Sequence, residues 1–109
     1  MKLEIEKKRA DDTSAELVLN GVVNIHTATK LREHLKSLLD DHRQELRVDL
    51  SGVSFIDSAG IATLVEGLQW SRGTGRRFVL AGLSDNVRDI FALAKLDTVF
   101  DIEKGHPPA

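Results

Sequence analysis

The sequence predicts an α/β protein: a mixed four- to five-stranded sheet that starts with an antiparallel pair, with about three to four crossover helices packed on it. Two patterns predict this class. A strand-like alternation fills the N-terminal part of the chain, and beyond Thr27 segments of helical spacing alternate with β-rich segments. A chain of 109 residues can bury one core. We therefore expect a single domain over residues 1–103 and a flexible C-terminal tail over residues 104–109.

The N-terminal segment has the periodicity of a strand. Apolar and charged residues alternate from residue 3 onward, and the polar turn ADDTS follows. The segment AELVLNGVV then resumes with aliphatic and β-branched residues, and Asn20–Gly21 marks a turn or bulge within it. We predict that these two segments form adjacent antiparallel strands.

The apolar spacing changes to three and four residues at Thr27, which is placed to cap a helix. The inward face of this first helix is formed by Ala28, Leu31, Leu35, Leu38 and Leu39. The segments LRVDL and VSFI then predict strand structure that is interrupted at Ser51–Gly52. A second helix follows, in which Ile61, Leu64, Val65 and Leu68 recur at helical spacing, and Gly73 and Gly75 end it.

The C-terminal third repeats this order of strand and helix. RFVLAG has the composition of a strand, and SDNVRDIFALAKL predicts a third helix capped by Ser84. The side chains expected to face inward from it are those of Val87, Ile90, Phe91 and Ala94. VFDI then predicts a short closing strand, and KGHPPA forms the tail.

Composition excludes several classes of protein. The net charge of −2 comes from interspersed acidic and basic residues, so no basic surface predicts direct nucleic-acid binding. There is no cysteine, which excludes disulfides and cysteine metal sites. The charged segment MKLEIEKKRADD is neither a signal peptide nor a membrane span, so we expect no membrane insertion and a cytoplasmic location.

Asp57 and Ser58 stand where the β-rich segment FI gives way to helical spacing. Taken alone, the pair is explained as a helix cap, which is worth about 1 kcal/mol. The same position also favours a phosphoacceptor, because a helix N-terminus stabilises an added phosphate and phosphorylation would add almost two negative charges beside Asp57. Both interpretations remain open at this point.

Catalytic and metal sites are poorly supported. Ile56 stands where a serine nucleophile elbow has glycine, and the four histidines at positions 26, 34, 42 and 106 lie among polar residues typical of a solvated surface. His34 and His42 have no third ligand nearby in the sequence. The segment GTGRR lacks the ending of a phosphate-binding loop and is better explained as a helix stop.

Three segments together resemble one family. LNGVVNIHTATKLREHL, VDLSGVSFIDSAGIATL and AGLSDNVRDIFALAKLDTVFDI are similar to the conserved parts of STAS domains, and in particular of free-standing bacterial anti-sigma factor antagonists. The resemblance covers almost the whole chain. It implies a partner switch, in which the unphosphorylated protein binds an anti-sigma factor serine kinase and the sigma factor is released. Phosphorylation would end that binding, and a phosphoserine phosphatase would restore it.

The resemblance also implies the site. Ser58 would be the phosphoacceptor, Asp57 its acidic neighbour, and Gly60 the small residue that permits close approach of the partner. The implied partner-binding residues are Asn24, His26, Thr27, Asp57, Ser58, Ala59, Gly60 and Thr63. The protein would be a substrate rather than an enzyme, with no cofactor and no metal of its own, because ATP and magnesium belong to the kinase. We expect a monomer or weak dimer in the absence of the partner.

Three residues depart from the family pattern. Ala59 replaces a frequent hydroxyl residue, Ala62 a frequent glycine, and Asn24 an aspartate common near the partner surface. The departure at Asn24 bears on the identity and the strength of the kinase contact, and not on the fold. Two alternatives stay open: a non-switching STAS subunit of a lipid-transport ATPase complex or signalling scaffold, and a hydrolase that uses Ser58.

Overall fold

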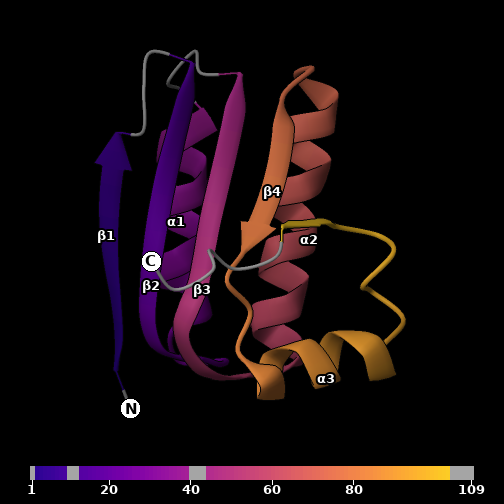
Figure 1. Cartoon of the computed structure of the whole chain (residues 1–109). Coiled ribbons are helices and arrows are strands. Elements are labelled where there is room, and N and C mark those ends of the chain that lie inside the picture. The colour runs from indigo at the N-terminus through magenta and orange to yellow at the C-terminus, as the bar shows by residue number, and fades with distance from the viewer. Residues whose placement is uncertain (1, 10–12, 40–43, 104–109) are drawn as a thin grey trace, which may run out of the picture.

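The structure is a computed structural model that describes residues 2–9, 13–39 and 44–103 (Figure 1). These residues form five strands and three helices. In chain order they are β1 (Leu3–Arg9), β2 (Ser14–Val23), α1 (Ala28–Leu39), β3 (Glu45–Ile56), α2 (Ser58–Gly73), β4 (Arg77–Ala81), α3 (Asp85–Leu93) and β5 (Asp101–Glu103). The α/β class predicted from the sequence is confirmed. The predicted tail, residues 104–109, lies outside the described residues.

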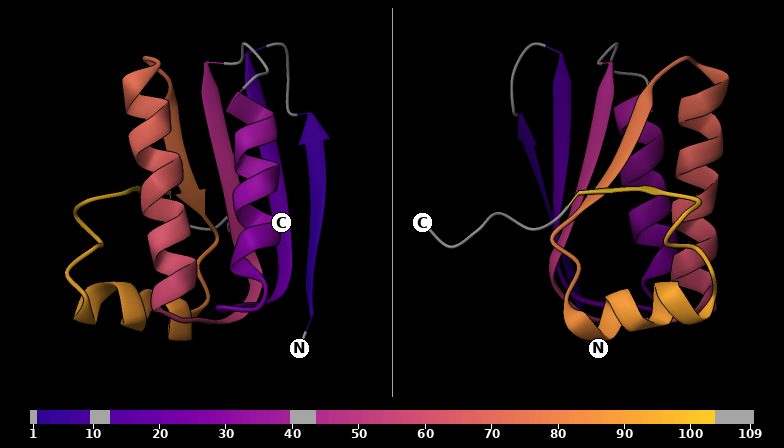
Figure 2. Two further views of the ribbon diagram at one scale, coloured as in Figure 1. Left: turned by 180° about the vertical axis from the view of Figure 1, so that it is seen from behind. Right: turned by 45° about the vertical axis from the view of Figure 1, so that its right-hand side comes forward.

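The sheet has the order β1-β2-β3-β4-β5. β1 pairs with β2 in the antiparallel sense, as predicted, and the remaining neighbours are parallel. Of the three crossover helices, α1 and α2 lie side by side on one face of the sheet (Figure 2). α3 lies across the end of the sheet at which β3 joins α2 (Figure 1). The carboxyl ends of β2 and β3 therefore meet the start of α2 at this end.

The hydrophobic core fills the space between the sheet and helices α1 and α2. α1 is amphipathic and buries a row of leucines against the central strands, whereas α2 buries Leu64 and Leu68 together with small residues. The fully buried side chains include Leu17, Leu19, Leu31, Leu35, Leu46, Val48, Leu50 and Leu64. Phe91 of α3 extends this core, because its ring centroid lies 5.6 Å from that of Phe100. No helix in the described part of the chain is both long and apolar enough to cross a membrane.

The interruption predicted at Ser51–Gly52 is wrong: β3 runs through these residues without a break. The register with β2 shifts between Val18 and Asn20, where β3 contributes one residue more than β2. The polar pair therefore marks an irregularity inside one strand, since β2 continues to pair with β3 on both sides of it.

Asn20–Gly21, for which the sequence leaves a turn or a bulge open, lies inside β2. Gly21 has a φ of 123° and the register with β3 shifts on either side of the pair, so the structure shows an irregularity of the bulge type and no turn.

The end of α3 also differs from the prediction. The helix stops at Leu93, and Ala94, which we expected to face inward, is exposed. Lys95 adopts a φ of 57°, and the amide of Leu96 donates to the carbonyl oxygen of Phe91 at 2.8 Å. This geometry ends the helix before Leu96.

The closing strand also differs from the prediction, which placed it over VFDI, residues 99–102. Phe100 packs into the core instead, and β5 begins only at Asp101.

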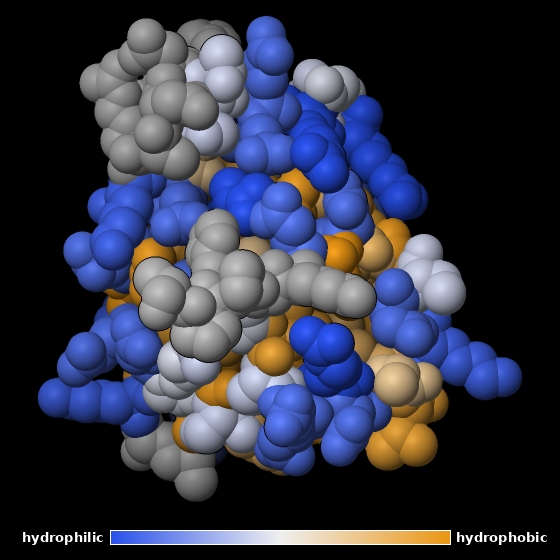
Figure 3. Space-filling view, viewed as in Figure 1, coloured by the Kyte–Doolittle hydropathy of each residue, from blue (hydrophilic) through white to orange (hydrophobic). Residues whose placement is uncertain are grey.

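The sheet face opposite α1 and α2 is mainly hydrophilic (Figure 3). Ion pairs cross several strands on it: Arg47 contacts Glu16, Glu45 and Glu103, and Arg77 contacts Glu45 and Asp101. The hydrogen bond and charge of Asp101 raise the pKa of Arg77 above its ordinary value. These pairs tie the three-residue strand β5 to β3 and β4.

Candidate functional site

Asp57 is the N-cap residue of α2. Its backbone is extended, with φ −104° and ψ −174°, and its side-chain Oδ1 accepts hydrogen bonds from the amides of Ala59 at 2.9 Å and Gly60 at 3.0 Å. Its carbonyl oxygen accepts the amide of Ile61 at 3.0 Å. One aspartate side chain therefore satisfies two of the amides that the first turn of a helix leaves without intrahelical partners. The capping interpretation of Asp57 is confirmed.

The second carboxylate oxygen of Asp57 reaches a different part of the chain. Oδ2 accepts the backbone amide of Ile25 at 3.1 Å, across 32 residues of sequence. The amide of Asp57 in turn donates to the carbonyl oxygen of Val23 at 3.0 Å. The start of α2 is thus attached to the segment that connects β2 to α1.

That connecting segment is held by its own side chains. Asn24 Oδ1 accepts the amides of His26 at 2.9 Å and Thr27 at 3.2 Å, while Thr27 Oγ1 accepts the amide of Asn24 at 2.9 Å and donates to Val22 O at 2.8 Å. Thr27 occupies the capping position, since its carbonyl oxygen accepts the amide of Leu31. Its hydroxyl, however, bonds to the preceding turn, so the predicted side-chain cap of α1 is wrong.

Ser58 is the first residue of α2 and is exposed. Within the described residues its hydroxyl has no hydrogen-bond partner, whereas the neighbouring Asp57 uses both of its carboxylate oxygens. No hydrogen bond within the described residues therefore fixes the orientation of this hydroxyl. No described histidine is bonded to it, so it lacks the general base that a catalytic serine requires. An accessible hydroxyl of this kind suits the acceptor of a reaction that another protein catalyses.

The eight residues predicted to bind a partner fall into two groups. Exposed or partly exposed positions are occupied by His26, Asp57, Ser58 and Ala59; buried positions are occupied by Asn24, Thr27, Gly60 and Thr63. Thr63 donates its hydroxyl to the carbonyl oxygen of Ala59 at 2.9 Å. All eight residues thus lie around one join, where the end of β3 meets the start of α2 beside the turn that follows β2. The four buried residues pack or bond beneath the exposed ones and contribute little to the surface.

Gly60 is close to other parts of the same chain. A Cβ atom at this position would lie 2.6 Å from Val23 Cγ1 and 2.7 Å from Ile56 Cγ1. The close approach that the glycine permits is therefore the packing of α2 against the ends of β2 and β3. The function expected from the sequence, room for a partner, does not explain this contact.

Sequence reasoning missed two exposed apolar side chains beside the site. Ile25 is 70% exposed and Phe55 is 45% exposed. Phe55 pairs with Val22 at the end of β3, two residues before Asp57, and the amide of Ile25 is bonded to Asp57. An apolar residue at the end of a strand gives no local sign of whether it is buried, so the exposure of Phe55 follows only from the three-dimensional arrangement.

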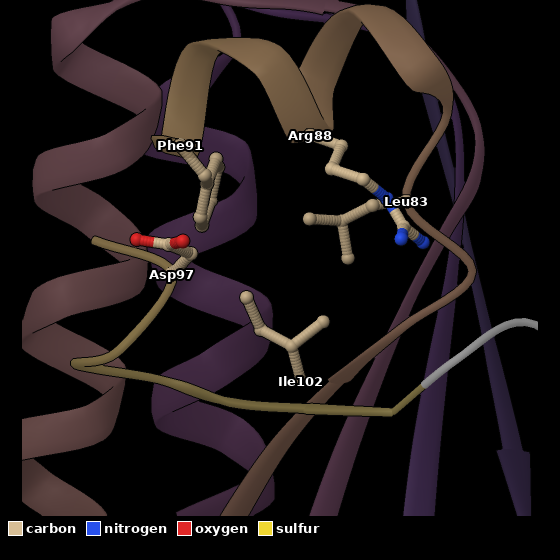
Figure 4. A pocket seen from close by; sticks show the side chains of 5 residues that line it. All are labelled: Leu83, Arg88, Phe91, Asp97 and Ile102. Carbon is tan, nitrogen blue, oxygen red and sulfur yellow. The ribbon is translucent and has the colours of Figure 1, made fainter. Parts of the chain in front are cut away.

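Metal and ligand sites elsewhere carry less information. Among the described residues, no group of three or more potential ligands could hold a metal ion. His34 lies on α1 with Nδ1 2.8 Å from Lys30 O, and His42, the second residue of the predicted pair, is outside the described residues. A pocket of about 220 Å³ lies between α3 and β5 and is lined by Leu83, Arg88, Phe91, Asp97 and Ile102 (Figure 4). None of the predicted site residues lines it.

Comparisons with known proteins agree with this geometry. The family model described as "Mlab, STAS domain" matches residues 6–103. The anti-sigma-B factor antagonist of Listeria monocytogenes is 30% identical over 103 residues, which cover 94% of this chain and 90% of that protein. The antagonist of the same name from Staphylococcus aureus is 26% identical over 105 residues, which cover 96% of each chain.

A solved structure supports the fold independently. The crystal structure of an anti-sigma factor antagonist from Mycobacterium paratuberculosis superimposes with a TM-score of 0.83 at 22% identity, covering 93% of this chain and 85% of that one. Fold, family model and relatives all agree along almost the whole described chain. The chain therefore belongs to the STAS domain family, among relatives that are anti-sigma factor antagonists.

Proposed function

We propose that this protein is an anti-sigma factor antagonist that acts by partner switching. Its unphosphorylated form binds an anti-sigma factor serine kinase, and the sigma factor held by that kinase is released. Phosphorylation of Ser58 abolishes the binding. The observation that carries the proposal is the exposed Ser58 hydroxyl, which has no hydrogen-bond partner among the described residues and stands at the first position of α2.

The chemistry requires little from this chain. Ser58 Oγ attacks the γ-phosphorus of ATP held by the kinase, the bond to the β,γ-bridging oxygen breaks, ADP leaves, and the hydroxyl proton passes to a base of the kinase. A phosphatase reverses the modification by hydrolysis of the phosphoserine, which releases inorganic phosphate. This chain supplies an acceptor and a binding surface, so it is a substrate and not an enzyme.

The phosphate disrupts binding through charge and size. It adds almost two negative charges next to the Asp57 carboxylate, at a surface that otherwise presents a neutral hydroxyl. The amides of Ala59 and Gly60, which would otherwise attract a phosphate to a helix N-terminus, already donate to Asp57 Oδ1. The added charge is therefore compensated poorly within the chain and opposes a docked partner.

The contact surface centres on the exposed residues of the join, His26 and Ser58, and includes the partly exposed Asp57 and Ala59. The buried residues Asn24, Thr27, Gly60 and Thr63 hold these in position. Asn24, which stands where the family commonly has aspartate, directs its side-chain oxygen into the turn, so in this proposal it acts on the kinase contact through the shape of that turn. The proposal places the protein in the cytoplasm, where a sigma factor, its kinase and the phosphatase operate.

Mass spectrometry of the intact protein tests the proposal. The full chain and its Ser58→Ala variant are incubated with ATP and each candidate serine kinase of the same organism, followed by peptide mapping. One phosphate on Ser58, absent from the variant, is the expected result, together with loss of kinase binding by the modified protein. A folded protein that no candidate kinase modifies or binds would overturn the proposal.

A second candidate function keeps the fold but dispenses with the switch. The matched family model is named for a STAS domain called Mlab and not for an antagonist. In this alternative the same join docks constitutively, as a subunit of a lipid-transport ATPase complex or of a signalling scaffold. Co-purification with a transporter ATPase that is unaffected by Ser58→Asp would favour it over the switch.

A further inference from the structure

The Asp57 carboxylate connects two elements that are far apart in the sequence. Oδ1 serves the first turn of α2, and Oδ2 serves the amide of Ile25 in the connection between β2 and α1. Both oxygens are thus engaged immediately beside the proposed phosphoacceptor. Any charge placed on Ser58 acts on this carboxylate first.

We propose that Asp57 transmits the modification state of Ser58 to Ile25, and that Ile25 and Phe55 form an apolar contact with the partner, which is withdrawn when Ser58 is phosphorylated. The inference rests on the proposed function, because it concerns the regulation of the same surface. Beyond the proposed function, the inference states that the partner contributes an apolar depression to the contact. It also states the route by which the phosphate acts on that contact.

The first step is electrostatic. A phosphate on Ser58 repels the adjacent carboxylate and supplies three strong acceptor oxygens of its own. The Oδ1 atom is held by two amides, whereas Oδ2 is held by the amide of Ile25 alone. The bond to Ile25 is therefore the weaker attachment and the first to be lost or exchanged for a bond to phosphate.

The second step concerns how far the change spreads. The amides of His26 and Thr27 donate to Asn24 Oδ1, so their hydrogen bonds are independent of Asp57. The amide of Ile25, by contrast, donates directly to the Asp57 carboxylate. The change should accordingly be largest at Ile25, whose side chain is 70% exposed.

The exposed pair determines the kind of partner. Phe55 pairs with Val22 near the ends of β3 and β2, and Ile25 lies in the turn that follows β2, two residues beyond Val23. Large apolar side chains that flank a polar site are typical anchors of protein interfaces, which bury them in depressions of the partner. The occupant is therefore the anti-sigma factor kinase, through an apolar depression adjoining the region that receives Ser58.

Amide exchange with water, measured residue by residue by NMR spectroscopy, tests the transmission. Three full-length samples are compared: the unmodified chain, the chain synthesised with phosphoserine at position 58, and the Asp57→Asn variant. Asparagine keeps one oxygen for the amides of Ala59 and Gly60, but its NH₂ group cannot accept a hydrogen bond from the amide of Ile25.

We expect exchange at the Ile25 amide to accelerate about tenfold in both altered samples, which corresponds to a decrease of about 1.4 kcal/mol in the free energy of opening. The amides of His26 and Thr27 serve as internal controls and should not change.

Binding of the unphosphorylated chain to the kinase tests the apolar contact. Ile25→Ser should weaken binding by at least about tenfold, as expected of an interface anchor. Leu93→Ser is the matched control, because Leu93 is 85% exposed and lies on α3, so its loss should leave the affinity unchanged. Equal affinities of the Ile25→Ser variant and the unaltered chain would overturn the apolar contact.

The outcomes separate this inference from the function on which it rests. If phosphorylation abolishes kinase binding but exchange at Ile25 stays the same, the transmission is refuted and the switch stands. If no kinase binds or modifies the protein, the proposed function fails. Even then the exchange experiment decides whether Asp57 couples the two residues, because phosphoserine is incorporated during synthesis and needs no kinase.

Discussion

Gly60 lies so close to Val23 that a Cβ atom on Gly60 would come within 2.6 Å of Val23 Cγ1. Val23 is fully buried at the end of β2, and its carbonyl oxygen accepts the amide of Asp57. The first turn of α2 therefore rests directly on the strand end that precedes the Asn24–Thr27 turn. The position of Ser58 depends on this contact.

Gly60→Ala should destabilise the protein by about 1–3 kcal/mol, because an added methyl group in a close-packed contact forces the helix away from the strand. Denaturant unfolding followed by circular dichroism measures the change. Gly73→Ala is the matched control: it lies in the same helix with no atom within 4 Å of the added Cβ, and it should stabilise by about 0.5–1 kcal/mol. Equal effects of the two substitutions would contradict the packing argument.

Asp57→Ala should lower the free energy of unfolding by about 1–2 kcal/mol, since it removes the acceptor for the amides of Ala59 and Gly60. Asp57→Asn should cost less than Asp57→Ala, because asparagine still accepts the amides of Ala59 and Gly60 and loses only the bond from Ile25. Ser84→Ala, which removes the side-chain cap of α3, provides a second reference at about 1 kcal/mol. Thermal and denaturant unfolding of the three variants would refute the capping role if Asp57→Ala proved neutral.

The elements that local patterns describe could be predicted, and those set by distant contacts could not. The apolar spacing of Leu31 and Leu64 predicts α1 and α2, and the place of Asp57 before a helical period favours the cap that the structure shows. The bond from Ile25 to Asp57 spans 32 residues and has no local signature. The burial of Thr63 likewise depends on how α2 packs, which a single sequence does not state.

Helix ends show the same limit. The apolar spacing of α3 continues to Ala94 and Leu96, so periodicity alone extends the helix past its true end. The backbone of Lys95 leaves the helical region with a φ of 57°, and a lysine gives no warning of this, because glycine is the usual residue there. At Ser51–Gly52 the sequence is misleading in the opposite sense. This turn-like pair lies inside a strand that continues to pair with β2, although the pairing with β4 ends at Asp49.

Lys95→Gly should stabilise the protein by about 0.5–1 kcal/mol. A left-handed conformation is unfavourable for a residue with a Cβ atom and costs glycine nothing sterically, although glycine loses more entropy on folding. Lys95→Ala removes the same charge but retains the Cβ atom, so it separates the backbone effect from the electrostatic one. A melting temperature of Lys95→Gly at or below that of Lys95→Ala would refute the proposed strain.

Substitutions at Ser58 should separate folding from binding. Because the Ser58 hydroxyl bonds to no other described residue and is exposed, Ser58→Ala should change the free energy of unfolding by less than about 0.5 kcal/mol. Ser58→Asp should be similarly stable, since the favourable effect of a negative charge at a helix N-terminus opposes its repulsion by Asp57.

The two variants should nevertheless differ in kinase binding. Ser58→Ala should retain the affinity of the unaltered chain, while Ser58→Asp should bind the kinase at least about tenfold more weakly, which corresponds to about 1.4 kcal/mol. Unfolding curves and binding isotherms of the same preparations provide the comparison. A loss of binding that parallels a loss of stability would assign Ser58 a structural role, and equal binding by both variants would mean that negative charge at this position does not control the partner.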